Sequence, residues 1–153
     1  MVDVNMELPI ALSITKANVH DSTQFTIIYN RVKSYKTRFP MRIYTADKAF
    51  DSMFIRQTLL RDNVQPIIKA SKTPITPQYP PCFLKKYRKR TSVERFFSRL
   101  KEHLDVQKLQ VYGKEHVRFF AYLFCIGMLL VGYMNHLLGY SPRSVKTFLR
   151  MFT

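Results

Sequence analysis

Cysteine is scarce in this chain, with only Cys82 and Cys125 among 153 residues. The two lie far apart, and neither belongs to a CxxC pair or to an ordered Cys/His spacing. Zinc sites in proteins need such spacing, so the sequence argues against a structural zinc site. Two reduced thiols are the ordinary condition of a cytoplasmic protein, and we expect that location here.

A secretion signal is also missing from the sequence. The first ten residues, MVDVNMELPI, contain acids and show no apolar core after a basic start. A secretory signal peptide has both features, so we expect none here.

Acidic residues are few, since 10 Asp and Glu stand against 25 Lys and Arg, which gives a formal net charge of +15. Residues 85–101 hold eight basic side chains and one acid, Glu94. Apolar residues make up 46% of the chain, which excludes a disordered polycation. The charge indicates a polyanionic partner, either nucleic acid or an anionic membrane surface.

Charge is absent from residues 119–134, FFAYLFCIGMLLVGYM. Extended to Leu138, this run approaches the length of about 20 residues that a transmembrane helix needs. Asn135 and His136 interrupt its end. We expect a helix that is buried on all sides in a soluble core, with a membrane span over 119–138 as the alternative.

The first half of the chain alternates between strand and helix patterns. Apolar and β-branched runs predict strands, and apolar residues at helical spacing predict helices, in the order 7–15 (strand), 22–36 (helix), 41–46 (strand), 52–62 (helix) and 64–70 (strand). This alternation predicts an α/β layer with parallel strand pairs. Asp21 is expected to cap the first helix, and Asp51 or Ser52 the second.

Prolines separate this half from the rest of the chain. Residues 71–82 carry four prolines in twelve residues and predict a loop. Helical patterns follow at about 91–104, 114–138 and 143–151. We therefore expect one domain over 1–138 and a helical C-terminal tail over 139–153.

Asp47 is the first candidate for chemistry, because it directly follows the strand predicted at 41–46. In open α/β sheets, ligands bind beyond the carboxyl ends of the strands. A carboxylate there is suited to a hard cation such as Mg²⁺. The ordinary alternative is a loop aspartate that caps the next helix, but Asp51 and Ser52 are expected to fill that role.

Glu94 is the second candidate, and Thr91 with Glu94 also matches a capping box, which would give it a purely structural role. Glu94 and Lys101 are seven residues apart and share a helix face. A carboxylate that binds Mg²⁺ beside cations that hold phosphates is what phosphodiester chemistry requires.

A spaced set of four residues carries a family resemblance. Tyr87, Arg90, Glu94 and Lys101 have the spacing Y-x2-R-x3-E-x6-K. This resembles the signature of insertion-sequence transposases of the D-D-E class, which have an RNase H-like catalytic core. The stretches TKANVHDS (15–22), YTADKAFDS (44–52) and VERFFSRLKEH (93–103) also resemble segments of that family. The resemblance covers roughly residues 7–135.

The resemblance implies the following roles. Asp47 and Glu94 match the second and third catalytic acids, which hold Mg²⁺ or Mn²⁺ together with a first aspartate. The metals support cleavage of one strand at the transposon end and transfer of that end to target DNA. Tyr87, Arg90 and Lys101 match positions that contact DNA, and Arg95 and Arg99 are further candidates on the same basic helix. A homodimer on DNA is expected, and a small-molecule substrate is not.

The first catalytic aspartate has no match in this sequence. In the family it lies on the first sheet strand, upstream of the hairpin that leads into NVHDS. Asp3 matches the hairpin turn, Glu7 is the only other nearby acid, and Asp21 is explained as a helix cap. We therefore expect an α/β, RNase H-like core with a mixed sheet flanked by helices, incomplete at the N-terminus and inactive alone.

Only 46 residues separate Asp47 from Glu94, so the core is expected to be compact, without an inserted domain. Two other function classes stay open. One is a non-catalytic basic DNA-binding module, and the other is a small membrane protein built on 119–138.

Overall fold

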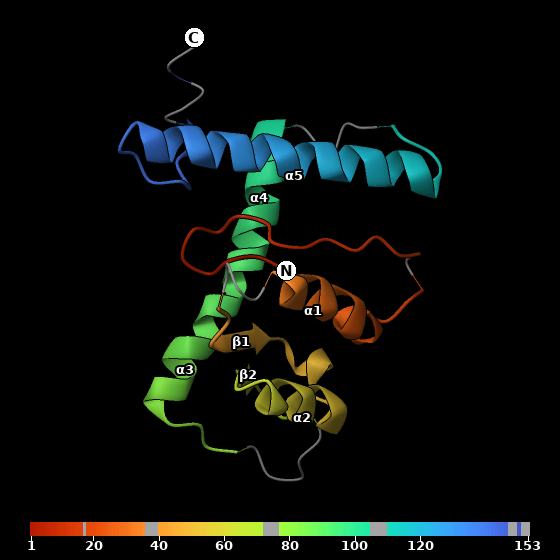
Figure 1. Cartoon of the computed structure of the whole chain (residues 1–153), viewed down its shortest axis with the longest axis vertical. Coiled ribbons are helices and arrows are strands. Elements are labelled where there is room, and N and C mark those ends of the chain that lie inside the picture. Colours follow the sequence, from red (N-terminus) through yellow and green to blue (C-terminus); the bar gives the residue numbers. More distant parts are fainter. Residues whose placement is uncertain (17, 36–39, 72–76, 105–109, 147–149, 151–153) are drawn as a thin grey trace. The chain divides into compact units, whose positions relative to one another are not determined.

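The computed structural model describes residues 1–16, 18–35, 40–71, 77–104, 110–146 and 150. The chain divides into two compact units. Unit 1 combines Met1–Lys16 with Ser92–Thr153, and unit 2 is the intervening segment Ala17–Thr91 (Figure 1). Unit 1 is therefore built from both ends of the sequence.

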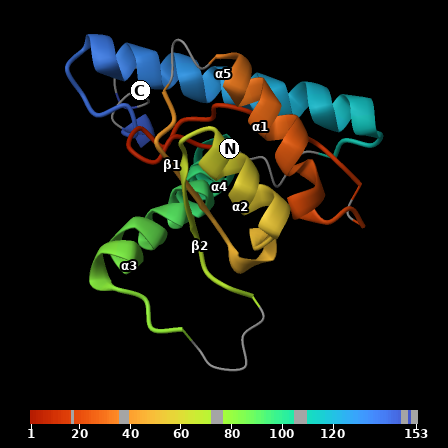
Figure 2. The same cartoon turned by 60° about the horizontal axis from the view of Figure 1, so that its bottom comes forward.

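Unit 2 follows the predicted alternation of helix and strand. Its elements are η1 (Asp21–Gln24), α1 (Phe25–Ser34), β1 (Ile43–Ala46), η2 (Lys48–Phe50), α2 (Met53–Arg61), β2 (Gln65–Ile68), α3 (Pro81–Arg88) and η3 (Lys89–Thr91). The two strands pair in parallel, from Ile43 opposite Gln65 to Ala46 opposite Ile68. Figure 2 shows these strands beside each other, with α2 next to β2. The predicted parallel pair is confirmed.

The core of unit 2 forms between the helices and the strands. Helix α1 contributes Phe25 and Tyr29, and α2 contributes Ile55 and Leu59, each pair at i, i+4 spacing on one helix face. Ala46, Val64 and Ile68 complete this cluster from the sheet and the turn before β2. The amphipathic patterns at 22–36 and 52–62 therefore mark the helix faces that build the core.

Of the predicted helix caps in unit 2, Asp21 is wrong, and Ser52 has the predicted position but makes no capping bond. His20, rather than Asp21, precedes η1, and its ring nitrogen accepts from the Ser22 amide. Ser52 precedes α2 without a capping side-chain bond. The Asp51 carboxylate instead accepts from Arg56 Nε at 2.8 Å and from the Ser71 amide at 2.8 Å. A charged partner and a backbone amide across the turn outcompete the local cap.

Helix α3 lies where the sequence predicted the end of a loop. Pro81 is its first residue, where the fixed φ of proline suits a helix start and no backbone N–H is needed. Residues 77–80 have no regular structure, in agreement with the loop prediction, and 72–76 lie outside the described residues.

Unit 1 contains α4 (Ser92–Leu104) and α5 (Lys114–Leu137), which cross each other in Figure 1. Phe96 and Leu100 of α4 pack with Cys125 and Met128 of α5, and Val145 joins them. The helices predicted at 91–104 and 114–138 are confirmed. In the predicted tail, 139–153, Val145 and Lys146 are helical, and 147–149 and 151–153 lie outside the described residues.

The strand predicted at 7–15 is not formed. An antiparallel bridge joins Val2 to Pro9, and residues 10–16 form neither a helix nor a strand. Glu7 has a positive φ of 55°, which turns the chain away from an extended path. The Asp3 carboxylate accepts from the amides of Asn5 and Met6, so Asp3 lies in the turn as predicted.

Helix α5 is not buried on all sides, contrary to the sequence prediction. Its buried residues are Cys125, Met128, Gly132 and Asn135, which form one stripe at helical spacing. Only 17% of its most apolar 18-residue window is buried. By length and composition α5 could cross a membrane, a test that the core helix of a soluble protein also passes. The prediction failed because the neighbouring segments of unit 1 cover a single stripe.

Candidate functional site

Two charged residues of unit 2 lie next to each other in position, each directly after the carboxyl end of a strand. Asp47 directly follows β1 and Lys69 directly follows β2. Because the strands are parallel and Ala46 lies opposite Ile68, both residues follow aligned carboxyl ends. Ligands of α/β sheets bind at this edge.

The Asp47 carboxylate serves no capping function. Asp47 precedes η2 without a capping side-chain bond, and its side chain is 55% exposed. Its Oδ1 lies 2.9 Å from Nη1 of Arg90. The fold thus joins two residues that the family resemblance singled out and that are 43 positions apart in the chain.

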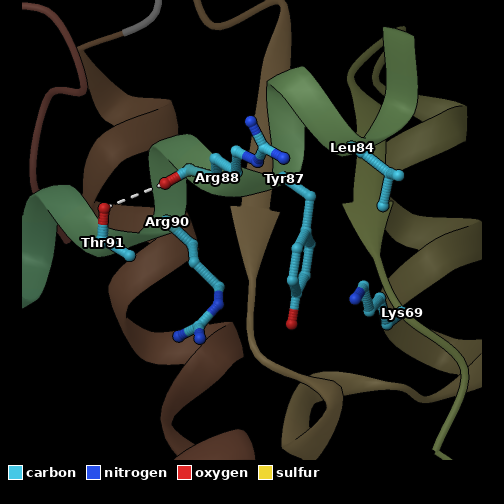
Figure 3. Close-up of a pocket in the computed structure, with 6 residues that line it drawn as sticks. All are labelled: Lys69, Leu84, Tyr87, Arg88, Arg90 and Thr91. Carbon is cyan, nitrogen blue, oxygen red and sulfur yellow. Dashed lines mark hydrogen bonds between the residues drawn. The ribbon is translucent and has the colours of Figure 1, made fainter. Parts of the chain in front are cut away.

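Tyr87 lies between two cations. Nζ of Lys69 is 4.8 Å from the centre of its ring, and Cζ of Arg90 is 5.3 Å from it. Figure 3 shows the Tyr87 ring with Arg90 on one side and Lys69 on the other. Burial raises the pKa of the Tyr87 hydroxyl, which Arg90 opposes and Asp47 reinforces, so the phenol is protonated at neutral pH.

These side chains border a pocket of about 300 Å³ in unit 2. Half of its lining residues are basic, and the lining consists of Lys69, Leu84, Tyr87, Arg88, Arg90 and Thr91. Thr91 donates its hydroxyl hydrogen to the Arg88 carbonyl at 2.9 Å (Figure 3). Lys69 was not identified from the sequence. It lies inside the strand predicted at 64–70, and only the observed end of β2 at Ile68 gives it the position that Asp47 has after β1.

Glu94 and Lys101 lie on α4 in unit 1, and both side chains are exposed. Asp47 belongs to unit 2, so the convergence of Asp47 and Glu94 stays a prediction. Thr91, which the capping-box pattern with Glu94 would place before the helix, is itself the last residue of the helical turn η3.

Arg95 and Arg99 of α4 bind a buried carboxylate that the sequence analysis did not single out as functional. Glu7 is 1% exposed, and its Oε1 accepts from Arg95 Nε at 2.6 Å. Arg99 donates both to the Glu7 carboxylate and to the Glu7 carbonyl oxygen. Arg143 approaches Glu7 to 3.6 Å. Two arginines four residues apart on one helix, facing a lone acid in the apolar run ELPIALS, were the available signal.

The Glu7 carboxyl is held in its charged form. Burial alone would raise its pKa, but the hydrogen bonds and positive charge of Arg99 and Arg95 outweigh burial and lower the pKa below its usual range. A buried carboxylate with such partners anchors the N-terminal turn to α4.

The described residues contain no group of three or more His, Cys, Asp or Glu side chains placed to hold a metal. The donors that the resemblance assigns have suitable chemistry, since Asp47 and Glu94 are accessible carboxylates and Mg²⁺ prefers oxygen ligands. Asp3 and Glu7 are engaged in the N-terminal turn and in the arginine cluster.

Comparison with known proteins gives one family assignment. No curated protein and no solved structure matches the chain. The transposase DDE domain family matches residues 1–130. This range covers most of the chain and contains Asp47, Tyr87, Arg90 and Glu94. The chain therefore belongs to the transposase DDE domain family.

Proposed function

We propose that this chain takes part in DNA transposition in the cytoplasm, as a catalytic region that cleaves and transfers strands at transposon ends. Transposase family membership implies DNA as the partner, and DDE transposase domains use divalent metal ions and have an RNase H-like fold. The mixed α/β structure with its small parallel sheet is consistent with part of that fold. The observation that carries the proposal is the cluster of Asp47, Tyr87 and Arg90 at the strand edge.

In this proposal Asp47 and Glu94 hold Mg²⁺ or Mn²⁺. A metal bound there would lower the pKa of its water and would stabilise negative charge on the attacking and leaving oxygens. Arg90 orients the Asp47 carboxylate and would add positive charge beside the bound DNA. Tyr87 positions the strand, and Lys101 binds a phosphate from α4.

Arg95 and Arg99 are also proposed to contact DNA, and the geometry ranks them differently. The Arg95 side chain is half exposed, so it can bind Glu7 and a phosphate together. The Arg99 side chain is only 15% exposed and donates to two acceptors on Glu7. Arg95 is therefore the stronger candidate of the two.

We further propose that the chain alone cleaves DNA poorly. The family uses three metal-binding acids. Of the acids near the start of the chain, Asp3 accepts hydrogen bonds from backbone amides and Glu7 forms ion pairs with arginines. Loss of one carboxylate lowers the affinity of a site for a divalent cation. The same observation favours a second function, a basic DNA-binding module without catalysis.

Nicking of DNA that carries the inverted repeats flanking the gene separates the two functions. Wild type, Asp47→Asn and Glu94→Gln are compared with Mg²⁺ or Mn²⁺, and DNA binding is followed by fluorescence anisotropy. Wild-type nicking that both substitutions abolish, with binding retained, supports catalysis. Equal binding by all three without nicking supports the binding module, and no binding by the wild type rejects both.

A homodimer on paired DNA ends is the assembly we propose. Mass photometry with a single end and with two ends in one DNA tests it. A mass of two chains on the two-ended DNA is expected, and one chain per end, without pairing, contradicts it.

A further inference from the structure

Lys69 lies in the pocket beside Tyr87, but the family signature does not include it. We propose that Lys69, together with Arg90 and Tyr87, forms a pocket for one backbone phosphate of the DNA strand that reaches Asp47. This inference rests on the proposed function, because it names the part of the DNA that the site binds.

The charge of Lys69 is available to an anion. Its ammonium lies 4.8 Å from the ring centre of Tyr87 and 5.9 Å from that of Tyr79, and both partners are neutral. No carboxylate within the described part of the chain forms an ion pair with it. Arg90, by contrast, already pairs with Asp47. Of the cations that line the pocket, Lys69 and Arg88 have no carboxylate partner among the described residues, and Lys69 is the one that lies over the Tyr87 ring.

The walls of the pocket suit a nucleotide backbone. Leu84 and the Tyr87 ring give apolar surface for a sugar, and Thr91 and the basic groups give polar surface for a phosphate. A volume of about 300 Å³ is at the small end of ligand pockets and matches one nucleotide rather than a duplex segment. Figure 3 shows Arg88 extending away from the Tyr87 ring, so Lys69 and Arg90 are the cations that flank the ring.

The location of the pocket links phosphate binding to the carboxylate. Lys69 and Asp47 follow aligned ends of β2 and β1, and Arg90 contacts both Asp47 and the Tyr87 ring. A phosphate at the hydroxyl end of Tyr87, where the cations on either side of the ring can both reach it, would therefore lie beside Asp47. This arrangement would fix the register of the strand relative to the reacting bond.

The test compares Lys69→Ala with Lys69→Arg and with Lys85→Ala. Lys85 is an exposed lysine on α3, so its removal costs the same net charge outside the pocket lining. Fluorescence anisotropy measures binding of labelled single-stranded and duplex oligonucleotides over a range of KCl concentrations. Circular dichroism melting curves establish that each variant is folded.

Lys69→Ala is expected to weaken binding about 10-fold at moderate salt and to lower the slope of log K against log salt by about 0.7–0.9, the value for one phosphate contact. Lys69→Arg should restore most of the affinity, and Lys85→Ala should lose less than about 3-fold. Bound DNA should also protect Lys69 more than Lys85 from acetylation, as read by mass spectrometry.

Equal losses for Lys69→Ala and Lys85→Ala, with equal acetylation, would overturn the pocket while leaving DNA binding intact. Failure of the wild type to bind any oligonucleotide would instead reject the proposed function, and the pocket with it.

Discussion

The two units of this chain are stabilised in different ways. Unit 2 is one continuous segment whose helices cover a parallel strand pair, and its core is formed by Phe25, Ile55, Leu59 and their neighbours. Unit 1 joins the first sixteen residues to α4 through the buried Glu7 carboxylate and its arginines. Apolar packing of neighbouring segments dominates the first, and an ion-pair cluster between distant segments is prominent in the second.

The two units also differ in the chemistry of their surfaces. Unit 2 places charge at its strand edge, where Asp47, Arg90 and Lys69 lie near Tyr87. Unit 1 exposes apolar side chains along α5, including Leu123, Ile126, Leu130 and Tyr133. Substitutions that affect one unit alone can test whether the division holds.

Leu59→Ala should have the largest effect. Leu59 is fully buried in unit 2, and such truncations cost about 3–4 kcal/mol through lost burial and the remaining cavity. Hydrogen exchange should show faster exchange at β1 and β2, while the buried thiol of Cys125 in unit 1 keeps its protection. Simultaneous exposure of Cys125 would contradict two separable units.

Glu7→Gln should destabilise unit 1 by about 3 kcal/mol, because it leaves the mostly buried Arg99 guanidinium without its carboxylate. Labelling of Cys125 by a thiol reagent, in a Cys82→Ser background, should accelerate about 100-fold if opening becomes easier by that amount. Asp3→Asn, in the same N-terminal turn, is the control and should change the rate far less. Unchanged labelling in Glu7→Gln would show that the ion pairs contribute little.

Acid should weaken both units, through one carboxylate in each. Burial raises the pKa of Asp51, but the Ser71 amide and Arg56 outweigh it and lower the pKa, as the arginines do for Glu7. A pKa lower in the folded than in the unfolded chain stabilises the fold above the ordinary carboxyl range, and this stability is lost as pH falls through the folded pKa.

Asp51→Asn should therefore cost about 1–2 kcal/mol at neutral pH and flatten the acid dependence of unit 2 alone. Urea unfolding between pH 7 and pH 3, with hydrogen exchange to separate the units, measures this. An unchanged pH dependence of unit 2 in Asp51→Asn would contradict the assignment.

Substitution of Leu123 and Leu130 by Gln should have the smallest effect on stability, within about 0.5 kcal/mol each, since both side chains are exposed. Exposed apolar patches promote association, so static light scattering should show less aggregation in the double variant. Met128→Gln is the matched control on the same helix, where burial predicts strong destabilisation. Loss of stability in the Leu variants would contradict the exposure of Leu123 and Leu130 and would show that other residues pack on them.

The sequence predicted unit 2 better than unit 1, for a physical reason. Helical spacing at Phe25 and Tyr29, and the short apolar runs around Ile43 and Ile67, reflect local burial, so periodicity locates α1, β1 and β2. Helix α3 was missed because prolines read as a loop, although Pro81 suits a first helical position.

Burial in unit 1 depends on partners that lie far away in the chain. The apolar run of α5 predicted full burial, but the buried residues of this helix form one stripe through Cys125 and Met128. Glu7 gave little local signal, because its partners Arg95 and Arg99 are about ninety positions away. Asp47 was selected by its position after a predicted strand and Arg90 through the family signature, whereas Lys69 required the strand register to be known.

The discontinuity of unit 1 has a consequence for synthesis of the chain. A ribosome adds Glu7 before its partners Arg95 and Arg99, which follow 88 and 92 positions later. All of unit 2 has been translated before either arginine appears, so it can fold while Glu7 still lacks its ion-pair partners. Closing so long a loop is slow, and until it closes Val2 and Leu12 do not cover the cluster that Phe96 and Leu100 form with Cys125 and Met128. The ion pairs of Glu7 are therefore expected to form late, after unit 2 has had time to fold.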